Sequence, residues 1–209
     1  MSEPGPIGGS DRTNVFVTVG TDHHPFDRLI GWVDSWLANG SQRAQSFVQY
    51  GTSSPPMVAG GRDYVSHDEM DSLIANAGVI VCHGGPGTII DCMRSGTKPI
   101  VVPRRHAFGE HVDDHQVRFA RRLEAAGYIK VADDERELAM LLRTALDGSP
   151  DFVARETGDV VRDTVARFAE LTGPLMPVLT VPGLTTLWRA HRILLDHTEL
   201  HRRLCMIQP

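Results

Sequence analysis

The sequence predicts an α/β fold in which a parallel sheet carries helices on both faces. Short apolar runs rich in β-branched residues, such as 15–19 and 79–82, alternate with stretches whose apolar residues recur at helical spacing. Strands that are apolar along their whole length are typical of a parallel sheet buried on both sides. Gly20, Gly51 and Pro103 end three of the runs, where a strand gives way to a loop. The alternation therefore predicts a sheet of about six strands.

The expected elements follow one another along one Rossmann-like domain over residues 15–171. Strands are expected at 15–19, 47–50, 79–82, 99–102 and 128–131, with the ambiguous segment 57–65 as a candidate for one more. Helices are expected at 26–37, 66–77, 87–94, 110–126, 133–146 and 152–171. The helix at 66–77 opens with Ser66 and Glu69, which is the pattern of a capping box. The helix at 133–146 opens with acidic side chains, which favour a helix N-terminus.

The segments outside this domain differ from it in composition. Residues 1–14 contain Gly, Pro and Ser without an apolar run, so a disordered tail is expected rather than a secretory signal. Residues 172–183 contain three prolines and are expected to be an extended linker. Residues 184–209 are expected to hold a last helix with an apolar stripe and arginines beside it. This helix either folds back onto the domain or docks on another chain, and the sequence favours neither.

Composition excludes several classes of function. Hydrophobic residues make up 41% and charged residues 22%, as in an ordinary globular protein. The net charge of -5 provides no basic field for nucleic acid. No run approaches the roughly 20 apolar residues of a membrane span. Three cysteines have neither metal-ligand spacing nor an even count for disulfides, which favours a reducing, cytoplasmic location.

Three loops of unusual composition are expected to follow strands at one edge of the sheet. They are 20–22, 83–88 and 103–116. Open parallel sheets bind ligands outside the carboxyl ends of their strands, so these loops are the expected site. His23 and His24, in the first loop, are expected to face solvent.

The loop at 83–88 has the composition of a phosphate site. Its glycines let the backbone approach a ligand, and the helix that follows directs free N–H groups at it; they are Gly84, Gly85 and Gly87. Thr88 adds a hydroxyl and His83 an imidazole that could donate to a diphosphate oxygen. Asp91, one turn further, is expected to face the same pocket and to accept hydrogen bonds from two sugar hydroxyls. A tight βα turn alone would not need this combination.

The segment His83-Gly-Gly-Pro-Gly-Thr-Ile-Ile-Asp91 resembles the donor box of GT-B glycosyltransferases. From residue 15 to about 146 the chain resembles the glycosyltransferase family 28 C-terminal domain. Within that family it is similar to the single-domain subunits of split transferases. One kind makes dolichol-linked chitobiose in eukaryotes, and another serves bacterial exopolysaccharide assembly. The segments that look like the bacterial kind are 16–21, 26–29 and 109–116.

The resemblance implies a set of donor-binding residues in a UDP-sugar site that needs no cofactor. His83, Gly87 and Thr88 fall at the diphosphate. Asp91 falls where the family has a ribose-binding glutamate, which is one methylene longer. His115 and Gln116 fall where family members have two glutamines at the donor sugar. The resemblance also implies that four further residues lie at the cleft between the two GT-B halves or in the loop beside it. They are Gly20, Thr21, Arg104 and Glu110.

The resemblance further implies a separate partner. GT-B enzymes close two Rossmann-like domains around their substrates, and the sequence predicts one. The expected partner is a membrane-associated subunit that presents a lipid-linked saccharide acceptor and recruits this chain to the membrane. The reaction implied is direct displacement with inversion and without a metal. Asp22 and His23 are candidates for the general base, as is the partner. The donor could carry galactose, glucuronic acid, glucose or N-acetylglucosamine.

Other functions remain as alternatives. A nucleotide-sugar epimerase shares the architecture, and a non-catalytic nucleotide-sugar-binding subunit would share the site. A dinucleotide dehydrogenase is disfavoured, because Gly20 is not followed by the G-x-G-x-x-G pattern. His111 and His115 stand four apart on an expected helix, so a metal could join them. Val112 occupies the position where metalloproteases have glutamate, and no metal site is expected.

Overall fold

The computed structural model describes residues 15–39 and 45–153, which form a parallel sheet covered by helices. The sheet has six strands in the order β3-β2-β1-β4-β5-β6, and every neighbouring pair is parallel. Their bounds are β1 Val15–Thr18, β2 Ser46–Gln49, β3 Gly60–Arg62, β4 Val79–Cys82, β5 Ile100–Val101 and β6 Lys130–Val131. The predicted fold class and strand number are confirmed.

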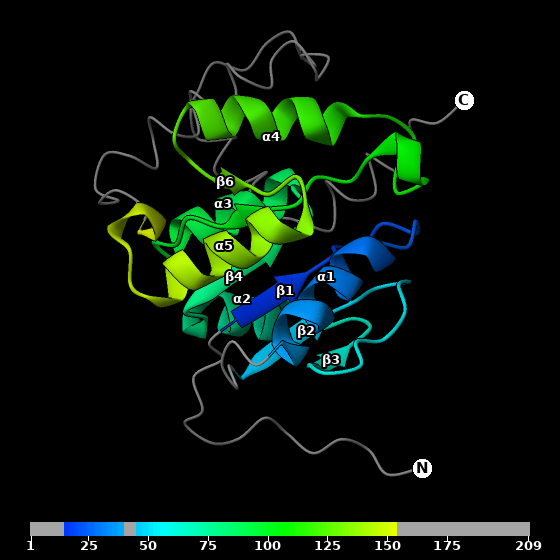
Figure 1. Cartoon of the computed structure of the whole chain (residues 1–209), viewed down its shortest axis with the longest axis horizontal. Helices are drawn as coiled ribbons and strands as arrows, with labels where there is room; N and C mark the ends of the chain where they lie inside the picture. The colour runs from blue at the N-terminus through cyan, green and yellow to red at the C-terminus, as the bar shows by residue number, and fades with distance from the viewer. Residues whose placement is uncertain (1–14, 40–44, 154–209) are drawn as a thin grey trace, which may run out of the picture. The chain divides into compact units, whose positions relative to one another are not determined.

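Helices cover both faces of the sheet. They are α1 Asp27–Ala38, α2 His67–Asn76, α3 Pro86–Arg94, α4 His115–Ala125 and α5 Glu135–Leu146, with short 3-10 turns η1 His106–Phe108 and η2 Pro150–Phe152. In Figure 1, α1 and α5 lie in front of the sheet and α2 and α3 behind it. Among the described helices, none is long and apolar enough to span a bilayer.

Alternation along the strands explains this layering. Val15 and Val17 of β1 pack with α1 and α5, while Phe16 packs on the opposite face with α2. All four residues of β1 and of β4 are buried, because both strands are central and covered on two sides. Burial on both faces is the reason why these strands are apolar throughout.

Local signals in the sequence set several of the observed boundaries. Ser66 and Glu69 form the predicted capping box at the start of α2, and Asp134 accepts a hydrogen bond from the Glu137 N–H at the start of α5. The ambiguous segment 57–65 contains β3. The expected helix at 152–171 is described only at its beginning, where Phe152 ends η2. The remainder of that helix, the tail, the linker and the last helix lie outside the described residues.

The predicted start of α4 at Glu110 is wrong, because this helix begins at His115. The Glu110 carboxylate is bound by the Arg28 side chain, and its carbonyl accepts from Arg104. Asp114 in turn accepts a hydrogen bond from the His106 N–H. These contacts hold residues 110–114 as a loop folded back on η1. The helix therefore begins only after this loop.

Candidate active site

Three loops meet at the carboxyl edge of the central strands. The strand order changes direction between β1 and β4, so the connections leaving these two strands diverge to opposite sides of the sheet. Such a switch point is where open α/β sheets bind ligands. The predicted loops after β1, β4 and β5 all begin at this edge, since these strands are neighbours and parallel.

The imidazole of His83 packs between two glycines from different loops. A Cβ on Gly20 would lie 2.4 Å from His83 Cε1, and a Cβ on Gly85 would lie 2.4 Å from His83 Nε2. Neither position has space for a side chain, and Gly20 also has a φ of +79°. The structure therefore brings together predicted residues of the first and second loops, with His83 only 8% exposed.

The first turn of α3 faces open space beside this histidine. Gly85 is the N-cap residue, and it has no side chain that could accept a hydrogen bond from the backbone N–H groups of the first turn. Pro86 occupies the start of the helix, where a backbone N–H would have no partner within the helix, so its lack of an N–H costs nothing. A Cβ on Gly87 would meet nothing within 4 Å, and Gly87 is exposed. Thr88 is half-buried in the same turn. This helix start can receive an anion.

Burial sets the protonation state of His83. Desolvation and the nearby positive charge of Arg104 lower the pKa of His83 to about 4. The ring is therefore neutral at neutral pH and carries one N–H donor. Its Nδ1 has no hydrogen-bond partner among the described residues.

This depressed pKa predicts acid sensitivity of the fold. The unfolded chain binds a proton at His83 near pH 6.5, whereas the folded chain does so only near pH 4. Between these values the unfolded state holds more protons, so the free energy of unfolding falls as the pH falls. The expected loss is roughly 3 kcal/mol at about 1.4 kcal/mol per pH unit. Urea denaturation of the wild type and of His83→Gln across this range measures it; identical pH dependence in both proteins would contradict the assignment.

Arg104 ties the loop after β5 to the loop after β1. It is fully buried, and its Nη1 donates to the carbonyls of His24 at 2.6 Å and Glu110 at 3.0 Å. Its Nη2 donates to the carbonyl of Val19 at 2.8 Å. Each of these carbonyls belongs to a loop backbone, so this arginine fixes the spacing of the two loops.

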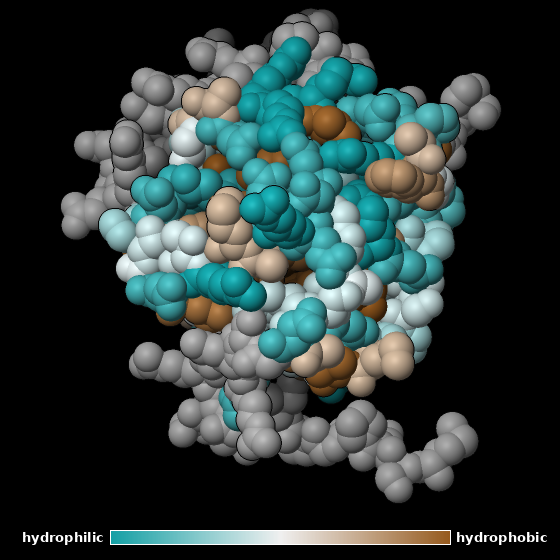
Figure 2. Space-filling model, viewed as in Figure 1, coloured by the Kyte–Doolittle hydropathy of each residue, from teal (hydrophilic) through white to brown (hydrophobic). Residues whose placement is uncertain are grey.

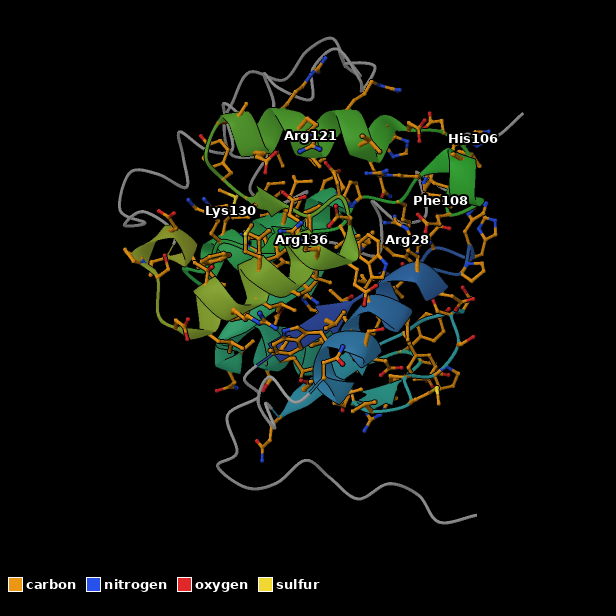
Figure 3. All side chains as sticks on the ribbon, viewed as in Figure 1. Arg28, His106, Phe108, Arg121, Lys130 and Arg136 are labelled. Atoms are coloured by element: carbon orange, nitrogen blue, oxygen red, sulfur yellow. The ribbon has the colours of Figure 1, made fainter. Side chains whose placement is uncertain are left out.

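Sequence reasoning missed Arg28, which completes this connection. Its Nε and Nη2 donate to the two carboxylate oxygens of Glu110 at 2.7 and 2.8 Å, across 82 residues of sequence. Its guanidinium also lies within 5.2 Å of the ring centres of Phe26, Trp32 and Phe108. Figure 3 shows Arg28 at the start of α1, beside the turn that carries Phe108. The available signal was an arginine in the segment 26–29, which already carried the family resemblance.

Asp22 lies between imidazoles from the loop after β1 and the loop after β5. His24 Nδ1 is 2.6 Å from Asp22 Oδ1, and His111 Nε2 is 3.7 Å from Asp22 Oδ2. His23 Nδ1 is 3.8 Å from Oδ1 and its side chain is 83% exposed, as expected. The predicted solvent exposure of His24 is wrong, because its ring is hydrogen-bonded to Asp22 and stacks against His111, which leaves most of it buried.

The remaining predicted residues lie on α3 and α4. Gln116 is buried in the first turn of α4, and its Oε1 has no donor among the described residues. His115 begins that helix and bonds Asp113. His111 precedes the helix rather than sharing it, yet its ring packs against that of His115 at 4.5 Å. Asp91 is half-buried and lies 3.5 Å from Arg94 on the same helix. Thr21 is exposed, and Gly84 has a φ of +93° that favours glycine.

The cysteines within the described residues are unsuited to nucleophilic catalysis. Burial raises the pKa of Cys82 to about 12 and the pKa of Cys92 well above its ordinary value. A thiol that stays protonated and covered is inert.

A hollow between α1 and α5 is separate from these loops. It is lined by Trp36, Asn39, Glu135, Arg136, Ala139 and Arg143. Figure 2 shows the face that carries these two helices as a mixture of polar and apolar side chains.

The chain is similar to known glycosyltransferases. The family model "Glycosyltransferase family 28 C-terminal domain" matches residues 14–158. The UDP-N-acetylglucosamine transferase subunit ALG13 of Eremothecium gossypii is 38% identical over 78 residues, covering 36% of this chain and 36% of that protein. The UDP-N-acetylglucosamine--N-acetylmuramyl-(pentapeptide) pyrophosphoryl-undecaprenol N-acetylglucosamine transferase of Shewanella loihica is 29% identical over 127 residues, covering 58% of this chain and 32% of that protein.

Among solved structures, MurG of Acinetobacter baumannii aligns over 78% of this chain and 51% of its own, with a TM-score of 0.49 and 17% identity. The chain spans about a third of the length of the curated relatives named above.

Proposed function

The chain belongs to the glycosyltransferase family 28 C-terminal domain, and from this premise we propose that it is the donor-binding, catalytic subunit of an inverting UDP-sugar glycosyltransferase. One observation carries the proposal. At the switch point of the sheet, α3 begins without a side-chain cap, and Gly87 in its first turn faces open space that can receive a diphosphate.

The donor would extend from this helix across the three loops. The diphosphate would accept from the first-turn N–H groups of α3 and from the Thr88 hydroxyl. Asp91 would bind the ribose. Gln116 and His115 would contact the sugar, and the buried Gln116 Oε1 without a donor among the described residues supports this role. A sugar hydroxyl there would satisfy an otherwise costly buried acceptor.

The same groups would assist departure of UDP. Displacement at the anomeric carbon puts growing negative charge on the leaving diphosphate. The positive end of α3 and the hydroxyl of Thr88 would stabilise that charge more in the transition state than in the ground state. Arg104 and Glu110 would position the loops, since their polar groups bind protein atoms.

Asp22 is the proposed general base on this chain. Burial raises the pKa of its carboxyl, but hydrogen bonds from His24 and the charge of Arg104 more than offset this, so the pKa lies below its ordinary value. The carboxylate is then ionised and able to accept the proton of an acceptor hydroxyl. His23, which is more exposed, could receive the proton next.

The acceptor and the partner are inferred from the relatives. The Eremothecium protein is named as a subunit, and the Shewanella enzyme is named for a pyrophosphoryl-undecaprenol substrate. By analogy, this chain would work on the cytoplasmic side of a membrane with a membrane-associated subunit that presents a lipid-linked saccharide. Exopolysaccharide assembly is the process proposed, on the resemblance of the segments 16–21, 26–29 and 109–116.

Nucleotide selectivity tests this proposal. Saturating UDP is expected to raise the free energy of unfolding by about 2.7 kcal/mol at a hundredfold excess over Kd. NAD at the same concentration is expected to have no effect. Thermal unfolding with UDP, ADP and NAD measures the difference. An unchanged Tm with UDP, together with a rise with NAD or ADP, would overturn the donor assignment.

A further inference from the structure

Three imidazoles lie around the Asp22 carboxylate beside the donor loops. The Asp22 carboxylate has His23 and His24 on one oxygen, at 3.8 and 2.6 Å, and His111 on the other, at 3.7 Å. The ligand-type atoms of Asp22, His23 and His24 all lie within 4.8 Å of one another. Asp22, His23 and His24 are consecutive in the loop after β1, whereas His111 comes from the loop after β5, so the fold brings the third imidazole to this carboxylate.

Hydrogen bonding explains His24 but not His111. His24 Nδ1 contacts Asp22 directly, whereas 3.7 Å is too long for a hydrogen bond from His111 Nε2. The other ring nitrogen of His111 is buried and has no hydrogen-bond partner among the described residues. Only 12% of the His111 side chain is exposed. This buried nitrogen, Nδ1, lies 3.9 Å from Asp113 Oδ1, and the ring is held beside the Asp22 carboxylate by stacking on His24 and by packing against His115.

The spacing between His111 and Asp22 matches that of two ligands of one metal ion. A zinc-class ion lies about 2.0–2.2 Å from nitrogen and carboxylate oxygen ligands, so two ligands of a tetrahedral site stand roughly 3.3–3.7 Å apart. The distance between His111 Nε2 and Asp22 Oδ2 falls at the upper end of that range. The two loops are also fixed beforehand, because Arg104 binds the carbonyls of Val19 and His24 from the first loop and of Glu110 from the second.

We propose that Asp22, His23, His24 and His111 form a binding site for one divalent transition-metal ion of the zinc class. On binding, the ion replaces the hydrogen bond between His24 and Asp22 and joins the loop after β1 to the loop after β5. Three nitrogens and one oxygen suit Zn²⁺, Co²⁺ or Ni²⁺, whereas Mg²⁺ and Ca²⁺ prefer oxygen ligands. Binding of the ion needs neither nucleotide nor acceptor, so it can be tested apart from the proposed transferase activity. Because Asp22 and His23 also serve as the proposed base, a bound ion would occupy that base and oppose sugar transfer.

Cobalt titration of the full chain without nucleotide tests the site. Co²⁺ is expected to bind with one-to-one stoichiometry and to give the visible absorption of a four-coordinate nitrogen–oxygen site. Zn²⁺ in excess is expected to displace it and remove the absorption, while Mg²⁺ in excess leaves the absorption in place. Asp22→Asn and, separately, His111→Gln are expected to weaken Co²⁺ binding by at least about tenfold, with far-UV circular dichroism confirming the fold of each variant.

Two controls separate this site from other histidines. His67 lies 3.6 Å from Asp71 on α2, a single surface pair of the same chemistry, and His67→Ala is expected to leave Co²⁺ binding unchanged. A variant with His191, His197 and His201 changed to alanine, all outside the described residues, is also expected to bind Co²⁺ like the wild type. No binding by the wild type, unchanged binding in Asp22→Asn and His111→Gln, or loss of binding in either control would overturn the proposal.

Discussion

Gly87→Ala is expected to weaken UDP binding by about tenfold or more, or roughly 1.4 kcal/mol, while leaving the fold intact. A Cβ at this position would meet no protein atom within 4 Å, so the methyl group would project into the space proposed for the diphosphate. Alanine is the better helix former, and the free energy of unfolding is expected to stay the same or to rise by up to about 1 kcal/mol. Calorimetry with UDP and urea denaturation measure the two quantities.

Gly85→Ala is the matched variant with the opposite expected result. A Cβ at this position would lie 2.4 Å from His83 Nε2 and force the buried ring to move. Overpacking of this kind costs about 1–3 kcal/mol of unfolding free energy. The two variants together distinguish Gly85, which is required for stability, from Gly87, which is required for UDP binding. Wild-type UDP affinity in Gly87→Ala would refute close approach of the donor to this backbone.

Sugar transfer is expected to be negligible for the purified chain and to rise by several orders of magnitude when the partner subunit is co-expressed. The donor groups described lie on the loops of one sheet, and catalysis also needs the acceptor oriented at the anomeric carbon. Orientation of that kind supplies about 7–11 kcal/mol of barrier reduction in favourable cases. Transfer of labelled sugar to a lipid-linked acceptor, with and without the partner, measures the gain.

Truncation after Leu171 locates the contact with the partner. The removed segment, 172–209, lies outside the described residues and contains the apolar stripe and arginines of the predicted last helix. We expect the truncated chain to bind UDP but no longer to co-purify with the partner. A truncated chain that unfolds would favour a helix that completes this domain instead. Robust transfer by the full chain alone would refute the two-subunit proposal.

Strands could be predicted from the sequence where burial on both faces of the sheet requires apolar residues. β1 and β4 are covered on both faces, so each reads as a continuous apolar run. β3 was ambiguous because its residues are Gly-Gly-Arg, and its strand geometry comes from pairing with β2 rather than from its own propensity. The start of α4 was misplaced for a related reason, since the contact between Glu110 and Arg28 overrides the local helical pattern.

The site was predictable where chemistry is local and not where it depends on distant contacts. The segment from His83 to Asp91 places its glycines and threonine at a helix start within a few residues. Arg28, by contrast, acquires its role from Glu110, which lies 82 residues away in the sequence. The stacking of His24 against His111 likewise depends on how two loops are held, and no spacing in the sequence encodes it.

A crystal structure of the chain with bound UDP would show directly where the donor binds. We predict the diphosphate within hydrogen-bond distance of the backbone N–H groups of Gly87 and Thr88, at the first turn of α3. We also predict the ribose beside Asp91. UDP bound at another place, such as the hollow between α1 and α5, or a diphosphate without contact to the start of α3, would contradict this prediction.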